Sequence, residues 1–169
     1  ALAKAKRQAN TYMEDITRRI GDKYAQKYPD KAEEYYRKAL EAKGKRLGLE
    51  DIRTFNLLGL ALRKQGKWLE AIEEYRKAQQ ISPRDENIYY NMAMAFAEGK
   101  DFEKAYKSLL KVLNINPDFY RQDATLAYNL GIIFARVDAL AQAKTFLEHA
   151  VEVNPGLQGA QRLLDSLPS

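Results

Sequence analysis

The chain has 169 residues, 46% of them hydrophobic, and its 28 Lys and Arg against 23 Asp and Glu give a formal net charge of +5. This length and composition fit one domain with a packed core or one compact repeat array. Because cysteine is absent and His149 is the one histidine, disulfides, thiolate catalysis and multi-His or Cys metal sites are excluded. We expect no metal and no cofactor.

The sequence contains no apolar run near the roughly 20 residues that cross a membrane. Its start, ALAKAKRQAN, has no apolar segment of the signal-peptide type behind its basic residues. We therefore expect a cytoplasmic protein. The first residue is not Met, which suggests a segment of a longer protein.

Residues 1–50 are predicted to form a first, atypical helical hairpin. A long N-terminal helix is indicated by apolar residues that recur every four positions: Tyr12, Ile16, Ile20, Tyr24 and Tyr28. Pro29 breaks this helix, and KAEEYYRKAL forms the next one. The stretch EAKGKRLGLED then adds five residues before the next unit, as a longer second helix or a polar loop.

One pattern of small, large and proline residues then recurs three times. Its members are Gly59, Ala71, Tyr75, Ala78 and Pro83, then Ala93, Ala105, Leu109, Val112 and Pro117, then Gly131, Ala143, Leu147, Ala150 and Pro155. Small residues let two helices approach closely, and proline ends the second helix of each pair. We predict repeats at 51–84, 85–118 and 119–155, followed by a capping helix at 156–169. Gly66, Gly99 and Asp138 are predicted to mark the turns within hairpins.

This pattern resembles the tetratricopeptide repeat (TPR) family, whose unit is about 34 residues and two antiparallel helices. The resemblance implies an all-α fold. It would be a right-handed α-solenoid of about four helical hairpins plus the C-terminal capping helix, a single array over 1–169 without strands.

The stretch NINPDFYRQDATLAYNLG is four residues longer than its counterpart one repeat earlier. Four residues are about one helical turn. We predict that the insert lengthens the first helix of the last hairpin, with Asp118 as its N-cap. Phe119 and Tyr120 would then lie at a rim, where they pack over the preceding hairpin or contact a partner.

No pattern in the chain is typical of an enzyme. His149 falls within a predicted helix and is interpreted as structural. The adjacent carboxylates Glu33–Glu34 and Glu73–Glu74 have basic partners four residues away and fit a solvated helix face. EAKGKRLG lacks the GK[ST] ending and the preceding strand of a phosphate-binding loop. We expect a non-catalytic protein.

The resemblance implies that a partner binds in a concave groove lined by the first helices. The family's groove positions fall on Arg53, Asn56, Leu60, Arg63, Lys64, Asn87, Tyr90, Met94, Thr125, Tyr128, Ile132 and Arg136. Equivalent tyrosines would form an aromatic step, beside apolar side chains and several cations. The groove would then suit a protein or peptide with apolar anchors and some acidic residues.

Some family members hold the C-terminal carboxylate of a heat-shock chaperone in a clamp of Lys and Asn. Asn91 and Asn129 match its Asn position, but Leu60 and Thr125 replace other clamp residues. We therefore reject the clamp.

The preferred interpretation is a bacterial interaction scaffold, as a region of a larger, signalling protein. One alternative is a helical repeat that binds RNA or another polyanion, disfavoured because acids interrupt the basic stretches. Another is a secretion-type TPR chaperone. The oligomeric state stays open, with a homodimer through the terminal helices as one possibility.

Overall fold

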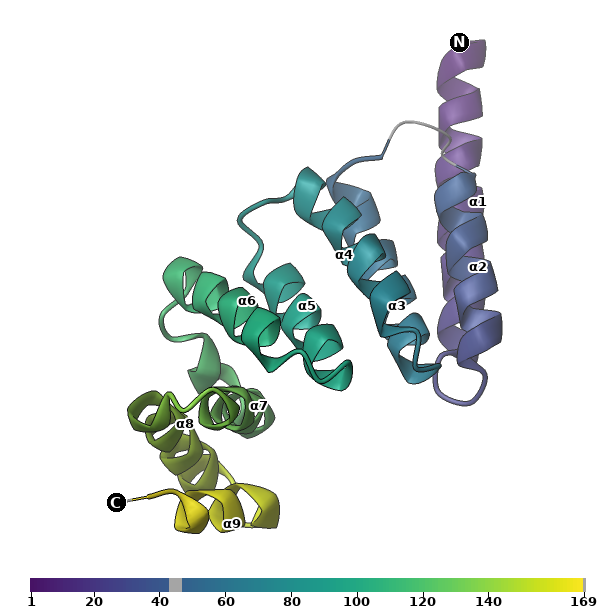
Figure 1. The fold of residues 1–169 in the computed structure, drawn as a ribbon. Coiled ribbons are helices and arrows are strands. Elements are labelled where there is room, and N and C mark those ends of the chain that lie inside the picture. The colour runs from purple at the N-terminus through teal and green to yellow at the C-terminus, as the bar shows by residue number, and fades with distance from the viewer. Residues whose placement is uncertain (43–46, 169) are drawn as a thin grey trace.

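The computed structural model describes residues 1–42 and 47–168, and within these ranges it holds helices and loops without a strand. Its nine α-helices there are α1 (Leu2–Tyr24), α2 (Pro29–Glu41), α3 (Ile52–Lys64), α4 (Trp68–Ile81), α5 (Glu86–Glu98), α6 (Phe102–Ile115), α7 (Ala124–Arg136), α8 (Leu140–Val153) and α9 (Gln158–Ser166). Two 3-10 helices, η1 (Leu49–Asp51) and η2 (Phe119–Gln122), precede α3 and α7. Consecutive α-helices pair into four hairpins that stack in a row, and α9 covers the far end (Figure 1). The predicted all-α helical repeat is confirmed.

The second and fourth hairpins close where a glycine of the first helix meets a large side chain of the second helix. A β-carbon added to Gly59 would lie 2.3 Å from the ring of Tyr75, and one added to Gly131 would lie 2.6 Å from Leu147. Both large side chains are fully buried. The helix backbones therefore approach as closely as the repeat pattern predicts.

The first hairpin uses the same device at a position that the sequence pattern did not reveal. A β-carbon on Gly21 would lie 2.7 Å from the ring of Tyr36, which is also fully buried. The hydroxyl of Tyr36 donates to a carboxylate oxygen of Asp22 at 2.8 Å. The atypical first unit is thus a packed hairpin of the same construction.

The turns within hairpins lie at the three predicted residues, Gly66, Gly99 and Asp138, but the residue that takes the left-handed conformation differs at one of them. Gly66 (φ 75°) and Asp138 (φ 60°) adopt the left-handed conformation, but in the third hairpin Lys100 (φ 64°) does so and Gly99 does not. Gly99 serves packing instead, because a β-carbon there would lie 2.6 Å from the indole of Trp68.

The four additional residues before α7 do not lengthen that helix. They form η2, and α7 begins at Ala124 with Asp123 as its N-cap. A carboxylate oxygen of Asp123 accepts hydrogen bonds from the backbone N–H groups of Thr125 at 2.6 Å and Leu126 at 3.2 Å. The prediction of an extra helical turn capped by Asp118 is therefore wrong.

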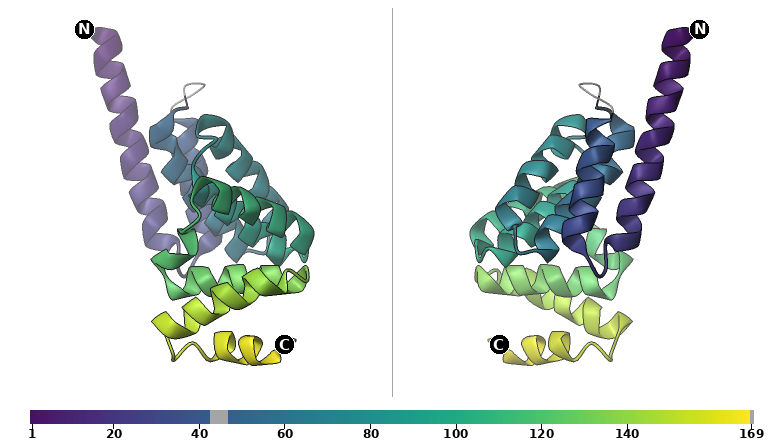
Figure 2. Two further views of the ribbon diagram at one scale, coloured as in Figure 1. Left: turned by 90° about the vertical axis from the view of Figure 1, so that its left-hand side faces the viewer. Right: turned by 90° about the vertical axis from the view of Figure 1, so that its right-hand side faces the viewer.

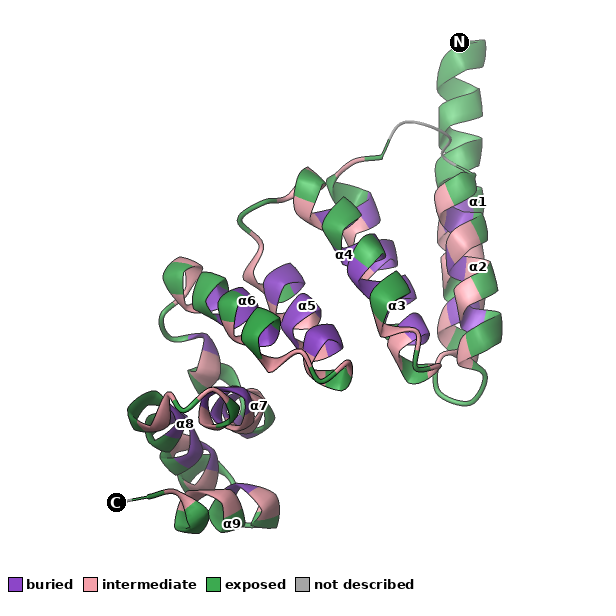
Figure 3. Ribbon diagram, viewed as in Figure 1, coloured by how far each residue is buried: buried purple, intermediate pink, exposed green. Residues whose placement is uncertain are grey.

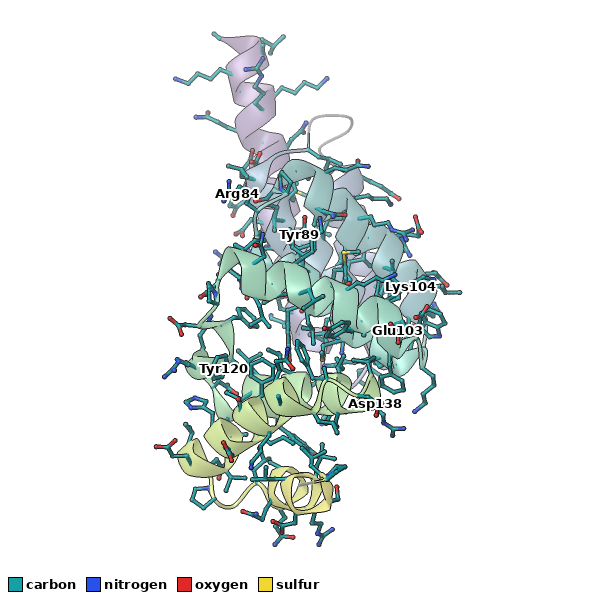
Figure 4. The ribbon with its side chains drawn as sticks, turned by 60° about the vertical axis from the view of Figure 1, so that its left-hand side comes forward. Arg84, Tyr89, Glu103, Lys104, Tyr120 and Asp138 are labelled. Carbon is teal, nitrogen blue, oxygen red and sulfur yellow. The ribbon has the colours of Figure 1, made fainter. Side chains whose placement is uncertain are left out.

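Burial of an aromatic side chain explains why the insert turns inward. Phe119 is only 1% exposed, and its ring centroid lies 5.4 Å from that of Tyr90 on α5. Tyr120, which is labelled in Figure 4, is half-buried. Its ring packs edge-on against the rings of Phe146 and His149 of α8. Phe119 is therefore a core residue of the joint between the third and fourth hairpins. Of the two alternatives expected for Phe119, the structure shows packing over the preceding hairpin, and the burial of its ring leaves no surface for a partner contact.

The N-terminal helix α1 is 23 residues long against 13 for α2 and projects beyond it (Figure 2). Residues 1–13 are all exposed (Figure 3). The expectation of a longer second helix or polar loop at EAKGKRLGLED falls partly on residues 43–46, outside the described residues. Before them α2 ends at Glu41, and after them η1 begins at Leu49.

A substitution of Gly59 separates close packing from helix propensity. Propensity alone predicts that Gly59→Ala stabilises an exposed helix by about 1 kcal/mol. The clash with Tyr75 predicts a lower unfolding free energy instead, by about 1–2 kcal/mol, as in overpacked cores. Urea denaturation measures this unfolding free energy. The control is Gly156→Ala at an exposed position, whose unfolding free energy should lie within about 0.5 kcal/mol of that of the wild type. Stabilisation by Gly59→Ala would contradict the close approach.

A pair of aspartate substitutions tests where α7 begins. Asp123→Ala removes a side-chain cap and should lower the unfolding free energy by about 1 kcal/mol. Asp118→Ala removes only an exposed ion pair with Arg121 and should change it by less than about 0.5 kcal/mol. Thermal denaturation compares the two variants. A larger loss of stability in Asp118→Ala than in Asp123→Ala would mean that Asp118 is the N-cap of α7.

Candidate peptide-binding groove

The first helices of successive hairpins line three hollows that follow one another along the array. The α3–α5 hollow is lined by Arg53, Asn56, Leu60 and Asn91 among others, and encloses about 570 Å³. The α5–α7 hollow, about 430 Å³, is lined in part by Arg63, Met94, Ile132 and Arg136. The α7–α9 hollow, about 710 Å³, adds Tyr128, Arg162, Leu163 and Leu167. Volumes of this size suit the side chains of a bound polypeptide.

Eight of the twelve residues predicted for the groove line these hollows. They are Arg53, Asn56, Leu60, Arg63, Met94, Tyr128, Ile132 and Arg136. Ile132 and Arg136 line two hollows each, so that the α5–α7 and α7–α9 hollows adjoin.

The other four predicted residues lie outside the hollows. Lys64 donates a hydrogen bond to the backbone carbonyl of Ala25 at 2.9 Å and so ties α3 to the first hairpin. Asn87 and Thr125 are exposed in the first turns of α5 and α7. Tyr90 turns toward the next repeat instead.

Tyr90 is part of the packing between α5 and α7. Its ring contacts Phe119, and its hydroxyl oxygen accepts a 2.7 Å hydrogen bond from the side-chain amide of Asn129. Burial raises the pKa of Tyr90, and the hydrogen bond from Asn129 only partly opposes this. The hydroxyl therefore stays protonated at neutral pH and acts as a structural link.

Tyr128 has an equivalent position in the next repeat and lies against the capping helix. A β-carbon on Gly159 of α9 would lie 2.5 Å from the hydroxyl oxygen of Tyr128. The two tyrosines therefore do not stand together as an open aromatic step. Each packs against the helix that follows.

The asparagines that match the chaperone clamp are also engaged within the array. The side-chain amide of Asn91 donates to the side-chain oxygen of Asn56 at 3.3 Å, which links α5 to α3. Asn129 links α7 to α5 through Tyr90. These amides hold neighbouring repeats together.

The cations of the groove differ in how firmly they are held. Two nitrogens of Arg63 donate to one carboxylate oxygen of Glu98, at 2.6 and 2.9 Å, across α3 and α5. Burial alone would lower the pKa of Arg63, but the hydrogen bonds and charge of Glu98 raise it. Arg136 lies over the ring of Phe102, 5.1 Å from its centroid, and Arg53 is exposed on α3.

The charge of the surface is positive overall. Five cations line the three hollows, namely Arg53, Arg63, Lys100, Arg136 and Arg162, against the carboxylates of Asp85, Glu98 and Asp138. Lys100 and Arg162 were missed from the sequence. The sequence pattern predicts only a capping role for the leucines of α9. It does not indicate that Leu163 and Leu167 also line the α7–α9 hollow.

The described ranges hold neither a membrane-spanning helix nor a cluster of metal-binding side chains. No helix there is long and apolar enough to span a bilayer. Within the same residues, no cluster of three or more His, Asp or Glu side chains could hold a metal ion.

Stacked antiparallel helix pairs with a hollowed surface along their first helices define an α-helical repeat protein. Two family models match individual repeats, one described as TPR repeat at residues 59–99 and one as Tetratricopeptide repeat at 24–46 and 86–119. The chain belongs to the tetratricopeptide repeat family.

The chain is similar to proteins with different roles. It is 29% identical over 108 residues to the BBSome complex member BBS4 homolog of Drosophila melanogaster, an alignment that covers 64% of this chain and 21% of that protein. The chain spans about a third or less of the length of the curated relatives it matches.

Solved structures share the fold. PilF of Pseudomonas aeruginosa has a TM-score of 0.72 at 23% identity, with 92% of this chain and 68% of that chain covered. The first TPR of Spaghetti (RPAP3), bound to the HSP90 peptide SRMEEVD, has a TM-score of 0.60 at 23% identity, covering 72% of this chain and 94% of that chain.

A double-mutant cycle measures what the Arg63–Glu98 pair contributes to the groove. Because the Arg63 side chain is only 16% exposed, we expect a coupling free energy of about 1 kcal/mol between Arg63→Met and Glu98→Gln in urea denaturation. The exposed Arg76–Glu73 pair on α4 should couple by only about 0.3 kcal/mol. An equal coupling free energy in the two pairs would mean that the Arg63–Glu98 pair is no stronger than an exposed surface ion pair.

Proposed function

We propose that the chain is a non-catalytic protein-interaction scaffold that binds a peptide or helix of its partner along the three hollows. The partner segment would carry apolar anchors beside acidic residues. The observation that carries this proposal is that the same hollows combine apolar side chains with an excess of cations.

The arrangement of the apolar side chains supports a peptide rather than a small ligand. Leu60, Met94 and Ile132 lie in successive hollows on α3, α5 and α7. Three separate apolar contacts along one surface fit a chain with anchors at intervals. Met94 adds a side chain that adapts to differently shaped anchors.

The charges support acidic residues between those anchors. Arg53 and Arg136 make no ion pair with any described residue, so both are available to a partner carboxylate. The HSP90 peptide held by the first TPR of Spaghetti also combines a methionine with acidic residues. Because the clamp positions differ here, we propose recognition of an internal acidic segment rather than of a C-terminal carboxylate.

The carboxylates of the same surface argue against a polyanion as the partner. Asp85, Glu98 and Asp138 line the hollows among the cations, and a nucleic acid backbone would be repelled by them. We further propose a cytoplasmic, bacterial setting within a larger signalling protein, and the division into repeats at 51–84, 85–118 and 119–155. No observation on the groove favours the secretion-type chaperone.

Charge reversal in the groove tests the proposal. A displayed library of random dodecapeptides would be selected on the wild-type chain, and the enriched peptides should carry acidic residues beside apolar ones. Affinity for such a peptide, measured by fluorescence anisotropy, should fall about tenfold or more in Arg53→Glu/Arg136→Glu, a loss of ~1.4 kcal/mol or greater.

The control makes an equal change of charge on the outer side of the array. Lys107→Glu/Lys111→Glu alters two exposed cations of α6 and should leave the affinity within about twofold of wild type. Circular dichroism checks that both variants stay helical. An equal loss of peptide affinity in both variants would mean that net charge alone sets the attraction. If neither variant lost affinity, the peptide would bind outside the groove.

A further inference from the structure

The two outer hollows of the groove are close to neutral in the charge of their described lining residues. The α3–α5 hollow is lined by one cation, Arg53, and one carboxylate, that of Asp85. The α7–α9 hollow is lined by Arg162 and Asp138, together with Arg136, which it shares with the α5–α7 hollow. An acidic side chain that enters either outer hollow therefore meets a carboxylate as well as a cation.

The α5–α7 hollow between them carries an excess of positive charge. Its described lining residues include three cations, Arg63, Lys100 and Arg136. They include one carboxylate, that of Glu98, which accepts hydrogen bonds of 2.6 and 2.9 Å from Arg63. Lys100 and Arg136 are exposed and make no ion pair with any described residue. Two cations are thus left to attract a negative group to this hollow.

Arg136 is held on the side of the α5–α7 hollow. Its guanidinium carbon lies 5.1 Å from the ring centroid of Phe102, and Phe102 lines that hollow. An arginine over an aromatic ring is attracted by the negative face of the ring and still has N–H groups along its edge to donate. Arg136 can therefore bind a carboxylate that enters the hollow beside Phe102.

Lys100 occupies a turn position that disfavours lysine. Gly66, Lys100 and Asp138 each precede the first buried alanine of the following helix by five residues, and their φ angles are 75°, 64° and 60°. Asp138 is labelled at this turn in Figure 4. Glycine adopts the left-handed conformation freely and aspartate tolerates it, whereas for lysine it costs free energy. Because Lys100 is exposed, burial does not offset that cost, and residues strained in this way cluster where a ligand binds.

We propose that the α5–α7 hollow is the anion subsite of the groove, in which Lys100 and Arg136 together bind one carboxylate of the partner segment. The two cations come from neighbouring hairpins, since Lys100 follows α5 and Arg136 ends α7. Met94 and Ile132 line the same hollow and shield one side of it from water, which strengthens the charge pairing. This assignment rests on the proposed function and adds which hollow receives the acidic residue.

The subsite sets an order of side chains in the partner segment. Leu60 of the α3–α5 hollow is 41% exposed, and Leu163 and Leu167 of the α7–α9 hollow are half-buried. A segment that follows the groove places apolar anchors in these outer hollows and its acidic residue between them. The partner therefore carries an apolar, acidic, apolar pattern rather than a run of acidic residues.

A double-mutant cycle between the chain and a bound peptide tests the subsite. In a dodecapeptide enriched on the wild-type chain, each acidic residue is replaced in turn by its amide. The most damaging replacement should weaken binding to the wild type about tenfold but binding to Lys100→Gly by less than about threefold, because the partner of the carboxylate is already missing. In Arg53→Met and Arg162→Met, which alter the outer hollows, the same replacement should still cost about tenfold.

The fold should survive the removal of the lysine side chain. Gly66 shows that glycine takes this turn position in the second hairpin, so the melting temperature of Lys100→Gly should not fall below that of the wild type. A loss of affinity then reports the missing ammonium group. Lys100→Arg keeps the positive charge at the same turn and should bind the peptide within about threefold of the wild type.

The outcomes separate this inference from the proposed function. If the amide replacement is coupled to Arg53 or Arg162 as strongly as to Lys100, the subsite is overturned while the proposed function stands. Full affinity of Lys100→Gly for the unaltered peptide would have the same meaning. If no peptide is enriched on the wild-type chain, or if the enriched peptides lack acidic residues, the proposed function fails and the subsite fails with it.

Discussion

The close approach of two helix backbones at one small residue per hairpin is the constraint on which the rest of the structure depends. At Gly21, Gly59 and Gly131 a single added carbon would collide with a buried side chain of the second helix, and Ala93 takes the same place in the third hairpin, fully buried. These contacts bury one face of each second helix against the first helix of its hairpin. The opposite faces of the first helices line the three hollows. The packing within the hairpins therefore determines which helices line the candidate groove.

The joints between hairpins decide which residues of that surface remain available. Tyr90, Asn91 and Asn129 are engaged in contacts from one repeat to the next, and Tyr128 packs on the capping helix. Positions that other members of the family use toward ligands are thus occupied within this chain. In the proposed function, recognition is therefore left to the arginines and to the apolar side chains between them, which is the physical reason for proposing acidic segments with apolar anchors.

The repeat period made much of this predictable from the sequence. The spacing of small residues located the contacts of Gly59 and Gly131, and eight of the twelve groove positions do line the hollows. The η2 turn was not predictable, because a helical turn and a 3-10 turn of four residues both restore the phase of the repeat. Only the burial of Phe119 against Tyr90 selects between them, and that contact joins positions far apart in the chain. The role of α9 in the groove depends likewise on its tertiary placement.

The central claim is that the first helices form the binding surface and the second helices form the outer wall. Backbone amide NMR shifts measured during titration with a bound acidic, apolar peptide test this most directly, because every helix is observed at once. The account predicts that the shifts concentrate on α3, α5, α7 and α9, around the lining residues of the three hollows. Shifts concentrated on the exposed faces of α4, α6 and α8 would contradict it.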